Sequence, residues 1–217
     1  MDRIKIKDRA QAVFSQDYWR LVGIVLLAAV ITGALAMLSY RYETNDMGIK
    51  VPTMKPAWGL ISLAFTIFVG NVVSVGLAKI CLAAYRGEAY DINDLFYFFK
   101  EGRYLKVVGA MALTTLFVTI GFILLIVPGI IIACGLSRVP YLLADEYPEG
   151  GMDVVKKSWD IMKGYKSDYF VFVLSFIGWM LLTAVTFGLV GIFYANPYMN
   201  IAQAGYHDDL MAAVPVE

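Results

Sequence analysis

Two cationic side chains lie where charge is expensive. Lys79 interrupts the apolar run that begins at Trp58, and Arg138 interrupts the run that begins at Val107. Ionisable residues at membrane depth usually face a polar cavity or a partner, and they mark candidate functional sites. Each cation lies about seven residues before the end of its apolar stretch, which is roughly 10 Å along a helix. Matching depth would let both cations face one central cavity that opens to the cytoplasm.

Polar neighbours indicate what such a cavity would bind. Two cations at one depth repel each other unless something negative lies between them, which favours an anion such as a lipid phosphate or a carboxylate. The candidate anion or lipid-headgroup site consists of Lys79, Arg138, Tyr141, Asn196 and Asn200. Two other interpretations of the cations remain open: snorkelling to the inner headgroups, and pairing with Asp145 or Glu88. The asparagines equally suit hydrogen bonds between helices.

Catalytic, metal and cofactor sites find little support in the sequence. The chain has one histidine, His207, no His-Glu-x-x-His zinc motif and no phosphate-binding glycine loop. Cys81 and Cys134 both lie inside apolar runs, where a thiol behaves as a small hydrophobe. We therefore expect no catalytic residue, no metal and no cofactor, and we expect that the protein is not an enzyme. The 18 basic and 18 acidic residues balance, which argues against a nucleic-acid partner.

The elements that must position these residues are membrane-spanning helices. The chain is 59% hydrophobic and 17% charged, against about 45–50% and 25% for soluble domains. One span needs about 20 apolar residues, and four uncharged stretches qualify: Leu21–Tyr40, Trp58–Ala78, Val107–Ser137 and Tyr169–Tyr206. The last two are each about twice the length of one span and should fold into hairpins. The sequence therefore predicts an all-α bundle of six spans, arranged as three hairpins, in one integral membrane domain over residues 1–217.

Proline and glycine mark the expected turns and kinks. Pro128 and Gly129 should form the turn of the first long stretch, because proline pre-sets φ at one turn position and glycine accepts a positive φ at the next. Gly188 should lie in the turn of the second. Pro140 and Pro197 should kink their helices and free carbonyl groups for neighbours.

Lysine and arginine predict the orientation, because they concentrate in cytoplasmic loops. On one side of the membrane lie thirteen cations: Arg3, Lys5, Lys7, Arg9, Arg20, Arg86, Lys100, Arg103, Lys106, Lys156, Lys157, Lys163 and Lys166. The other side has only Arg41, Lys50 and Lys55. Both termini should therefore be cytoplasmic.

A short amphipathic segment precedes each expected hairpin. The apolar faces are Ile6, Ala10 and Val13; Ile92, Leu95 and Phe99; and Val155, Trp159 and Met162. Such helices should lie on the inner membrane surface, or alternatively pack on one another above it. The chain thus divides into three repeat units, of about 1–85, 86–145 and 146–206. Gly76–Lys79 aligns with Gly135–Arg138, and Pro197-Tyr198 aligns with Pro140-Tyr141.

Several short pieces between residues 122 and 206 carry a family resemblance: Ile126-Val127-Pro128-Gly129-Ile130-Ile131, Leu143-Ala144-Asp145, Ser158, Met162-Lys163-Gly164-Tyr165-Lys166, Leu174-Ser175-Phe176-Ile177-Gly178-Trp179, Thr186 and Pro197-Tyr198. Through these pieces the chain resembles a bacterial family of integral membrane proteins, domain of unknown function 975. The family looks related to the membrane domain of some glycerophosphodiesterases, although this chain has no phosphodiesterase domain. The resemblance implies a multi-pass protein of the bacterial cytoplasmic membrane and supplies no catalytic residue.

Three functions are compatible with these features. We expect a non-enzymatic membrane module that binds lipid or a partner in envelope homeostasis or assembly. Its partners would be membrane lipids, anionic ones among them, a membrane protein or further copies of this chain. The first alternative is a small transporter or exporter of an anionic or amphipathic solute, which would need a continuous polar path. The second is a lipid-modifying enzyme.

Overall fold

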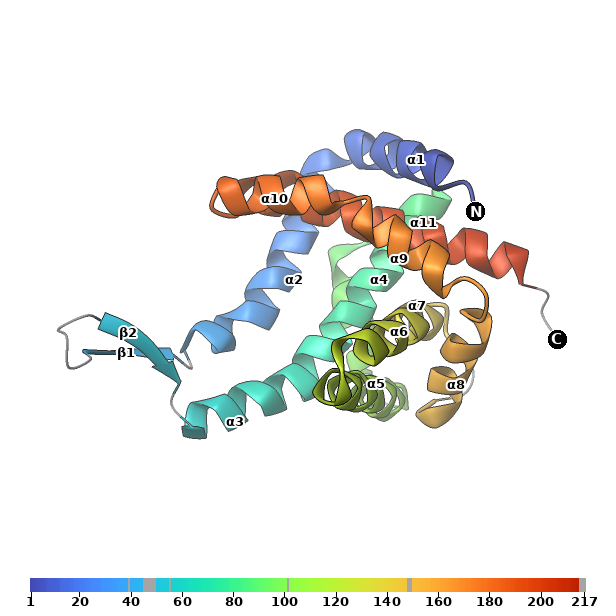
Figure 1. Ribbon diagram of the computed structural model, residues 1–217. Coiled ribbons are helices and arrows are strands. Elements are labelled where there is room, and N and C mark those ends of the chain that lie inside the picture. The colour runs from blue at the N-terminus through green and yellow to red at the C-terminus, as the bar shows by residue number, and fades with distance from the viewer. Residues whose placement is uncertain (39, 45–49, 55, 101, 148–149, 215–217) are drawn as a thin grey trace.

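The computed structural model describes residues 1–38, 40–44, 50–54, 56–100, 102–147 and 150–214, with no side-chain detail for residues 34–57. Lys55, one of the cations used to predict orientation, lies outside these ranges. The described chain is a helical bundle with one β-hairpin in the loop after the first long helix (Figure 1). Its strands, β1 (Tyr40–Thr44) and β2 (Lys50–Met54), pair antiparallel. The prediction of a helical bundle is confirmed at this level.

Eleven α-helices build the described bundle: α1 (Arg3–Gln16), α2 (Tyr18–Leu38), α3 (Pro56–Phe65), α4 (Asn71–Arg86), α5 (Tyr104–Leu124), α6 (Ile126–Leu136), α7 (Val139–Ala144), α8 (Met152–Ile161), α9 (Lys166–Leu174), α10 (Ile177–Val185) and α11 (Asn196–Ala213). A π-helical turn, Thr66–Gly70, joins α3 to α4, and another, Gly191–Ala195, leads into α11. A 3₁₀ helix, Ile92–Phe99, follows α4.

Four described helical stretches are long and apolar enough to cross a membrane. They are Trp58–Arg86, which runs from α3 through the π-helical turn into α4; Tyr104–Leu124, which is α5; Ile126–Ala144, which comprises α6 and α7; and Lys166–Val185, which comprises α9 and α10. A fifth is reached if α1 and α2, which are bent by 97° relative to each other, count as one broken span. The segment Asn196–Ala213 is not among them, so the six-span arrangement stays a prediction.

The turn between α5 and α6 differs from the predicted one. It lies at Leu125, whose extended backbone (φ −165°, ψ 154°) separates the two helices. Pro128 lies in the first turn of α6 instead, where its missing N–H removes no helical hydrogen bond. An added Cβ on Gly129 would lie 2.6 Å from the ring of Phe122, so this glycine lets α5 and α6 approach closely.

The turn after α10 lies where the sequence places it. Phe187 and Gly188 both have positive φ, of 52° and 88°, and the Gly188 N–H donates to the carbonyl of Thr183 at 2.8 Å. Pro140 lies in the first turn of α7, after the break that ends α6. Pro197 lies in the first turn of α11, directly after the π-helical turn.

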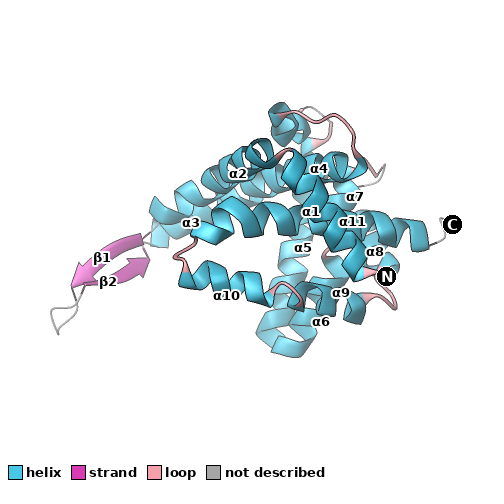
Figure 2. Ribbon diagram, turned by 90° about the horizontal axis from the view of Figure 1, so that it is seen from above, coloured by secondary structure: helices cyan, strands magenta, loops and turns pink. Residues whose placement is uncertain are grey.

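The amphipathic segments pack on other helices. Helix α1 buries Ile6, Ala10 and Phe14 and lies along α11 (Figure 2). The 3₁₀ helix Ile92–Phe99 packs on α4 and buries Leu95 and Phe98. The predicted face of this segment is therefore wrong at both ends, since Ile92 and Phe99 are exposed. The buried spacing of three is the period of a 3₁₀ helix, whereas the prediction assumed an α-helix.

Helix α8 packs between α5, α6 and α7. Val155 of this helix is buried, and so is Met162, which follows the last residue of the helix. Trp159 is half-buried. The Ser158 hydroxyl donates to the carbonyl of Gly135 at 2.9 Å. This bond fixes α8 against α6.

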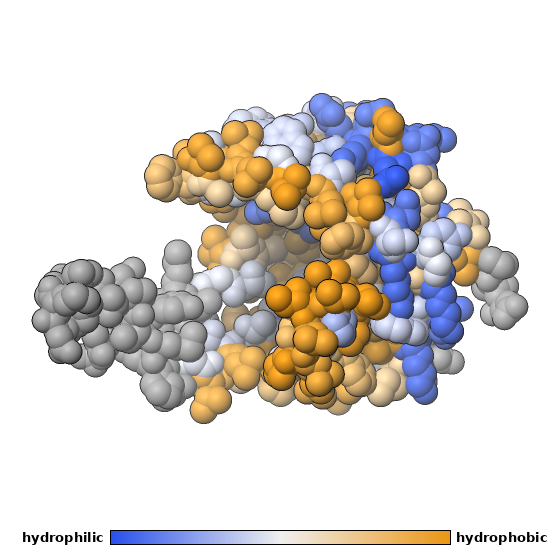
Figure 3. Space-filling model, in the orientation of Figure 1, coloured by the Kyte–Doolittle hydropathy of each residue, from blue (hydrophilic) through white to orange (hydrophobic). Residues whose placement is uncertain are grey.

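The two ends of the molecule differ in polarity. The β-hairpin lies at one end, and both termini lie at the other (Figures 1 and 2). Hydrophilic surface gathers at the end with the termini, whereas hydrophobic surface covers α10 and the α5–α6 hairpin, with a hollow between them (Figure 3). The exposed apolar side chains include Ile123, Val127, Leu181 and Val185. Such a contiguous apolar surface suits contact with lipid.

Candidate functional site

An ion cluster joins the ends of α4 and α7 to α11. It consists of Arg86, Asp145, His207 and Asp208. Arg86 donates to both carboxylate oxygens of Asp145, at 2.7 and 3.0 Å, and its Nη2 donates to Asp208 at 2.6 Å. Two carboxylates thus compensate one guanidinium whose side chain is about one third exposed. The cluster ties together three helices that are far apart in the sequence.

His207 is the buried member of this cluster. Its Nε2 lies 3.2 Å from Oδ2 of Asp145, and its ring stacks on Tyr141 with 5.5 Å between centroids. Burial lowers the pKa of His207, against the opposing effect of the hydrogen bond to Asp145. A neutral ring that donates from Nε2 to a carboxylate leaves Nδ1 as an acceptor, and this buried Nδ1 has no hydrogen-bond partner among the described residues.

Asp145 stays ionised beside His207. Burial by itself would raise the pKa of Asp145, but hydrogen bonds from His207 and Arg86 outweigh burial and lower this pKa to about 2. A carboxylate held this strongly is a poor general acid or base near neutral pH. The ion cluster therefore has the properties of a structural joint.

Arg138 is enclosed by three tyrosines, which we call the tyrosine cage: Tyr141, Tyr169 and Tyr206. The guanidinium carbon lies 4.9, 4.5 and 5.5 Å from their ring centroids, and the residue has 0% exposure. Nη1 donates to the carbonyl of Gln203 at 3.0 Å, and Nε donates to the Ser137 hydroxyl at 3.2 Å. Nη2 has no hydrogen-bond partner in the described part of the chain. Arg138 therefore does not snorkel to the surface.

Lys79 lies in a separate group with Glu146, Tyr97 and Arg103. Its Nζ is 3.3 Å from Glu146 and 3.2 Å from the centroid of the Tyr97 ring. Glu146 also accepts from the Tyr97 hydroxyl at 2.6 Å and pairs with Arg103 at 3.0 Å. Lys79 thus pairs with an acid, but this acid is Glu146. The interpretation from the sequence names Asp145 or Glu88 instead.

The structure does not bring the five candidate site residues into one cavity. Arg138 and Tyr141 are in contact, but Lys79 has different neighbours and lines a pocket with Glu88 and Glu146. Asn196 is exposed, and the Asn200 amide donates to the carbonyl of Asn196 on its own helix at 2.9 Å. The shared cavity inferred from matching depth is therefore absent among the described residues.

Sequence reasoning missed the ion cluster, although the repeat contains a signal for it. Arg86 and Asp145 are 59 residues apart. The aligned glycines have the same offset, since 135 − 76 = 59, and so do the two cations, since 138 − 79 = 59. Equivalent positions in two units would meet if the units pack around a common axis.

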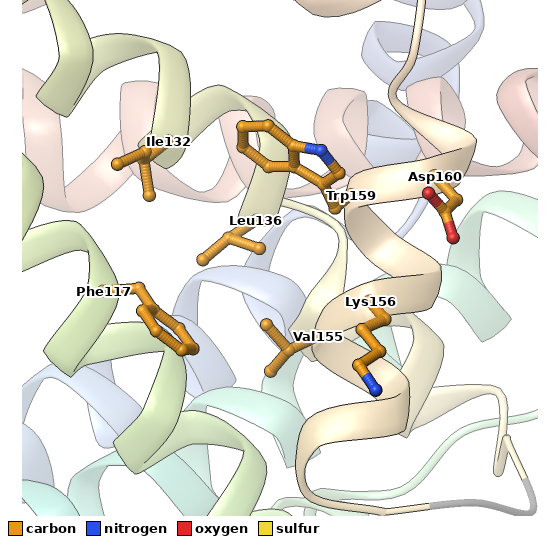
Figure 4. Close-up of a pocket in the computed structure, with 7 residues that line it drawn as sticks. All are labelled: Phe117, Ile132, Leu136, Val155, Lys156, Trp159 and Asp160. Atoms are coloured by element: carbon orange, nitrogen blue, oxygen red, sulfur yellow. The ribbon is translucent and has the colours of Figure 1, made fainter.

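An apolar groove, the α8 groove, lies between the α5–α6 hairpin and α8 (Figure 4). Its volume is about 310 Å³, and its lining consists of Phe117, Ile132, Leu136, Val155, Lys156, Trp159 and Asp160. The apolar side chains of α5 and α6 face Val155 and Trp159 across the gap, and the two charged side chains come from α8. Such a groove fits an apolar chain with a polar end.

No group of three or more His, Cys, Asp or Glu side chains that could hold a metal ion occurs in the described residues.

Burial raises the pKa of the Tyr90 hydroxyl, and a hydrogen bond to Asp17 adds to this effect. Tyr90 therefore stays protonated near neutral pH and ties the loop after α4 to the junction of α1 and α2.

Comparison with known proteins gives one match. Residues 109–213 match the sequence model of a family described as "Protein of unknown function (DUF975)". Searches of curated proteins and of solved structures found no match. The resemblance to this family is confirmed, while the relation to membrane domains of glycerophosphodiesterases stays a prediction.

Proposed function

The C-terminal half of this chain belongs to the DUF975 family of proteins of unknown function, and from its geometry we propose that the chain is a non-enzymatic membrane module that binds lipid. It resides in the bacterial cytoplasmic membrane with both termini in the cytoplasm. Its six spans are the four long apolar helices, α2, and a sixth over residues 189–206. This module serves envelope homeostasis or assembly.

The α8 groove carries this proposal. It combines an apolar lining with a basic segment, since Lys156, Lys157, Lys163 and Lys166 lie within or just after α8 and only Asp153 and Asp160 oppose them. Basic side chains beside an apolar surface attract anionic lipids of the inner leaflet. The exposed apolar surface of α10 and the α5–α6 hairpin supports the same environment.

The polar groups of the bundle support a module without catalysis. Lys79, Arg86 and Arg103 pair with carboxylates, and Arg138 is closed off by the tyrosine cage. Cations that already pair with a carboxylate or are enclosed by aromatic rings have little capacity left to bind and transform a substrate. The hollow between α10 and the α5–α6 hairpin has apolar walls (Figure 3), which suit lipid chains better than the polar path that a transporter needs.

The lipids that co-purify with the protein test this function. We would extract the full chain gently from its own membrane and compare the bound lipids with those of the bulk membrane. Anionic phospholipid enriched over the bulk composition is the expected result. Bound lipid of the same composition as the bulk would contradict the proposed function.

A further inference from the structure

We propose that the α8 groove is a site for one anionic phospholipid of the inner leaflet, with an acyl chain between the α5–α6 hairpin and α8 and its phosphate at Lys156. This inference rests on the proposed function and gives it a location. The shape and chemistry of the groove support it in three steps.

The lining matches a hydrocarbon chain. Phe117, Ile132 and Leu136 form one wall and Val155 and Trp159 the other, and the groove measures about 310 Å³ (Figure 4). Leu136 and Val155 are buried, while Phe117 and Ile132 are half-buried, so an apolar surface stays accessible from one side. Filling the groove with hydrocarbon would remove this surface from water or from loosely packed lipid.

The wall of the groove is fixed in place. Any Cβ on Gly135 would lie 2.5 Å from the Trp159 ring, so the indole lies directly on the backbone of α6. Lys166 also packs on this ring, with its Nζ 2.9 Å from the centroid. Together with the hydrogen bond from Ser158 to Gly135, these contacts hold the groove open as a formed site.

The charge at the rim favours an anion. Asp160 is neutralised by Lys163, with 2.7 Å between Oδ1 and Nζ. Lys156 is exposed and makes no ion pair within the part of the chain that the structure describes. The uncompensated charge next to the apolar lining is therefore positive. This charge favours a lipid with a net negative charge over a zwitterionic lipid.

Two neighbouring lysines provide a matched test. Lys156 lines the groove and Lys157 does not, although both lie on α8 and a change to glutamate alters the net charge equally. Native mass spectrometry in nonionic detergent with added phosphatidylglycerol should show one tightly bound lipid on the wild type and on Lys157→Glu. Lys156→Glu should bind it roughly 25-fold more weakly, because the change removes one positive and adds one negative charge, and each charge contributes about a factor of five. Lys156→Arg should bind like the wild type.

The outcomes separate the site from the function. Equal binding by Lys156→Glu and Lys157→Glu would overturn the groove as the site, while the proposed lipid binding would stand. No preference of the wild type for phosphatidylglycerol over phosphatidylcholine would overturn both.

A second measurement locates the lipid directly. In a variant with Trp19, Trp58 and Trp179 changed to phenylalanine, Trp159 fluorescence reports on the groove alone. Brominated phosphatidylglycerol in nanodiscs should quench this fluorescence more than brominated phosphatidylcholine at the same fraction. Equal quenching by the two lipids would contradict the proposal. The absence of quenching by either lipid, as expected if a second copy of the chain covers the groove, would contradict it as well.

Discussion

Individual polar residues in this bundle are stabilised in two different ways. Arg86 has two carboxylate partners, whereas Arg138 has three aromatic rings, a carbonyl and a hydroxyl. A buried charge needs such compensation, because removing it from water costs several kcal/mol. Cation–π contacts with a desolvated cation contribute about 2 kcal/mol. The tyrosine cage therefore replaces the acid that would be expected beside a buried arginine.

Replacing Arg138 tests the tyrosine cage. Arg138→Ala should lower the free energy of unfolding by roughly 3 kcal/mol, because the carbonyl of Gln203 and the cage lose their partner. Arg138→Lys should recover only part of this loss, since an ammonium does not stack on aromatic rings as a planar guanidinium does. Thermal unfolding in detergent measures both variants. A lysine variant as stable as the wild type would contradict a stacking role.

The buried histidine predicts a dependence of stability on pH. Because burial lowers the pKa of His207 in the folded chain, the unfolded chain takes up the proton first when the pH falls below the ordinary value of 6.5. The melting temperature should therefore decrease between pH 7.5 and 5.5. Asp145, whose pKa is lowered to about 2, stays ionised throughout and contributes nothing to this slope. His207→Gln should flatten the slope, and an unchanged slope would show that another group is responsible.

At the level of elements, glycines decide where the short helices pack. Any Cβ on Gly76 would lie 2.3 Å from the carbonyl oxygen of Leu95, in the 3₁₀ helix that follows α4. Gly135 receives Trp159 of α8 in the same way. The two glycines are equivalent in the repeat inferred from sequence. Each lets the next amphipathic segment lie directly on the helix backbone.

Gly76→Ala should destabilise the protein, because the backbone of the 3₁₀ helix would have to move. Gly109→Ala is the matched control, since Gly109 lies in α5 with nothing within 4 Å of an added Cβ. Alanine is a better helix former than glycine by about 1 kcal/mol, so the control should be neutral or stabilising. Thermal melts compare the two variants, and similar effects would refute the close packing at Gly76.

The sequence predicts the elements better than their joints. Apolar stretches of sufficient length predict the four long apolar helices, because a segment that crosses a bilayer must be apolar over its thickness. The turn at Leu125 and the π-helical turns carry no local sequence signal, since packing of neighbouring helices decides where a helical ladder breaks. The face of the 3₁₀ helix Ile92–Phe99 was mispredicted for a related reason, as its period differs from that of an α-helix.

The candidate site was harder to predict than the fold. Matching depth predicted one cavity for Lys79 and Arg138, whereas Lys79 pairs with Glu146 and Arg138 is buried in the tyrosine cage. Depth along a helix does not determine which way a side chain points around that helix. The ion cluster depends on contacts between three helices, so only the shared offset of 59 residues indicated it in the sequence.

At the scale of the whole molecule, the short helices connect the units that the sequence predicts. The 3₁₀ helix Ile92–Phe99 packs on α4, α8 packs on α6, and α1 packs on α11. Each amphipathic segment thus lies on the last long helix of the unit before it, and the first segment lies on the last helix of the chain. The ion cluster joins the ends of α4 and α7 to α11 at the same end of the molecule. Three units around an axis along the membrane normal stay a prediction.

Cysteine labelling tests this topology. In a background with Cys81 and Cys134 changed to alanine, single cysteines at Ser15, Thr44 and Ala212 would be exposed in intact cells to a membrane-impermeant maleimide. Six spans predict labelling at position 44 only. Labelling at position 212 as well would indicate an odd number of spans and would contradict the sixth.

Lipid binding is the central claim, and the melting temperature of the purified full chain tests it most directly. A ligand that binds only the folded state raises the melting temperature with its concentration. Titration with phosphatidylglycerol should raise the melting temperature progressively, and titration with phosphatidylcholine should raise it much less. The same shift with both lipids, or none with either, would contradict a specific site for anionic lipid.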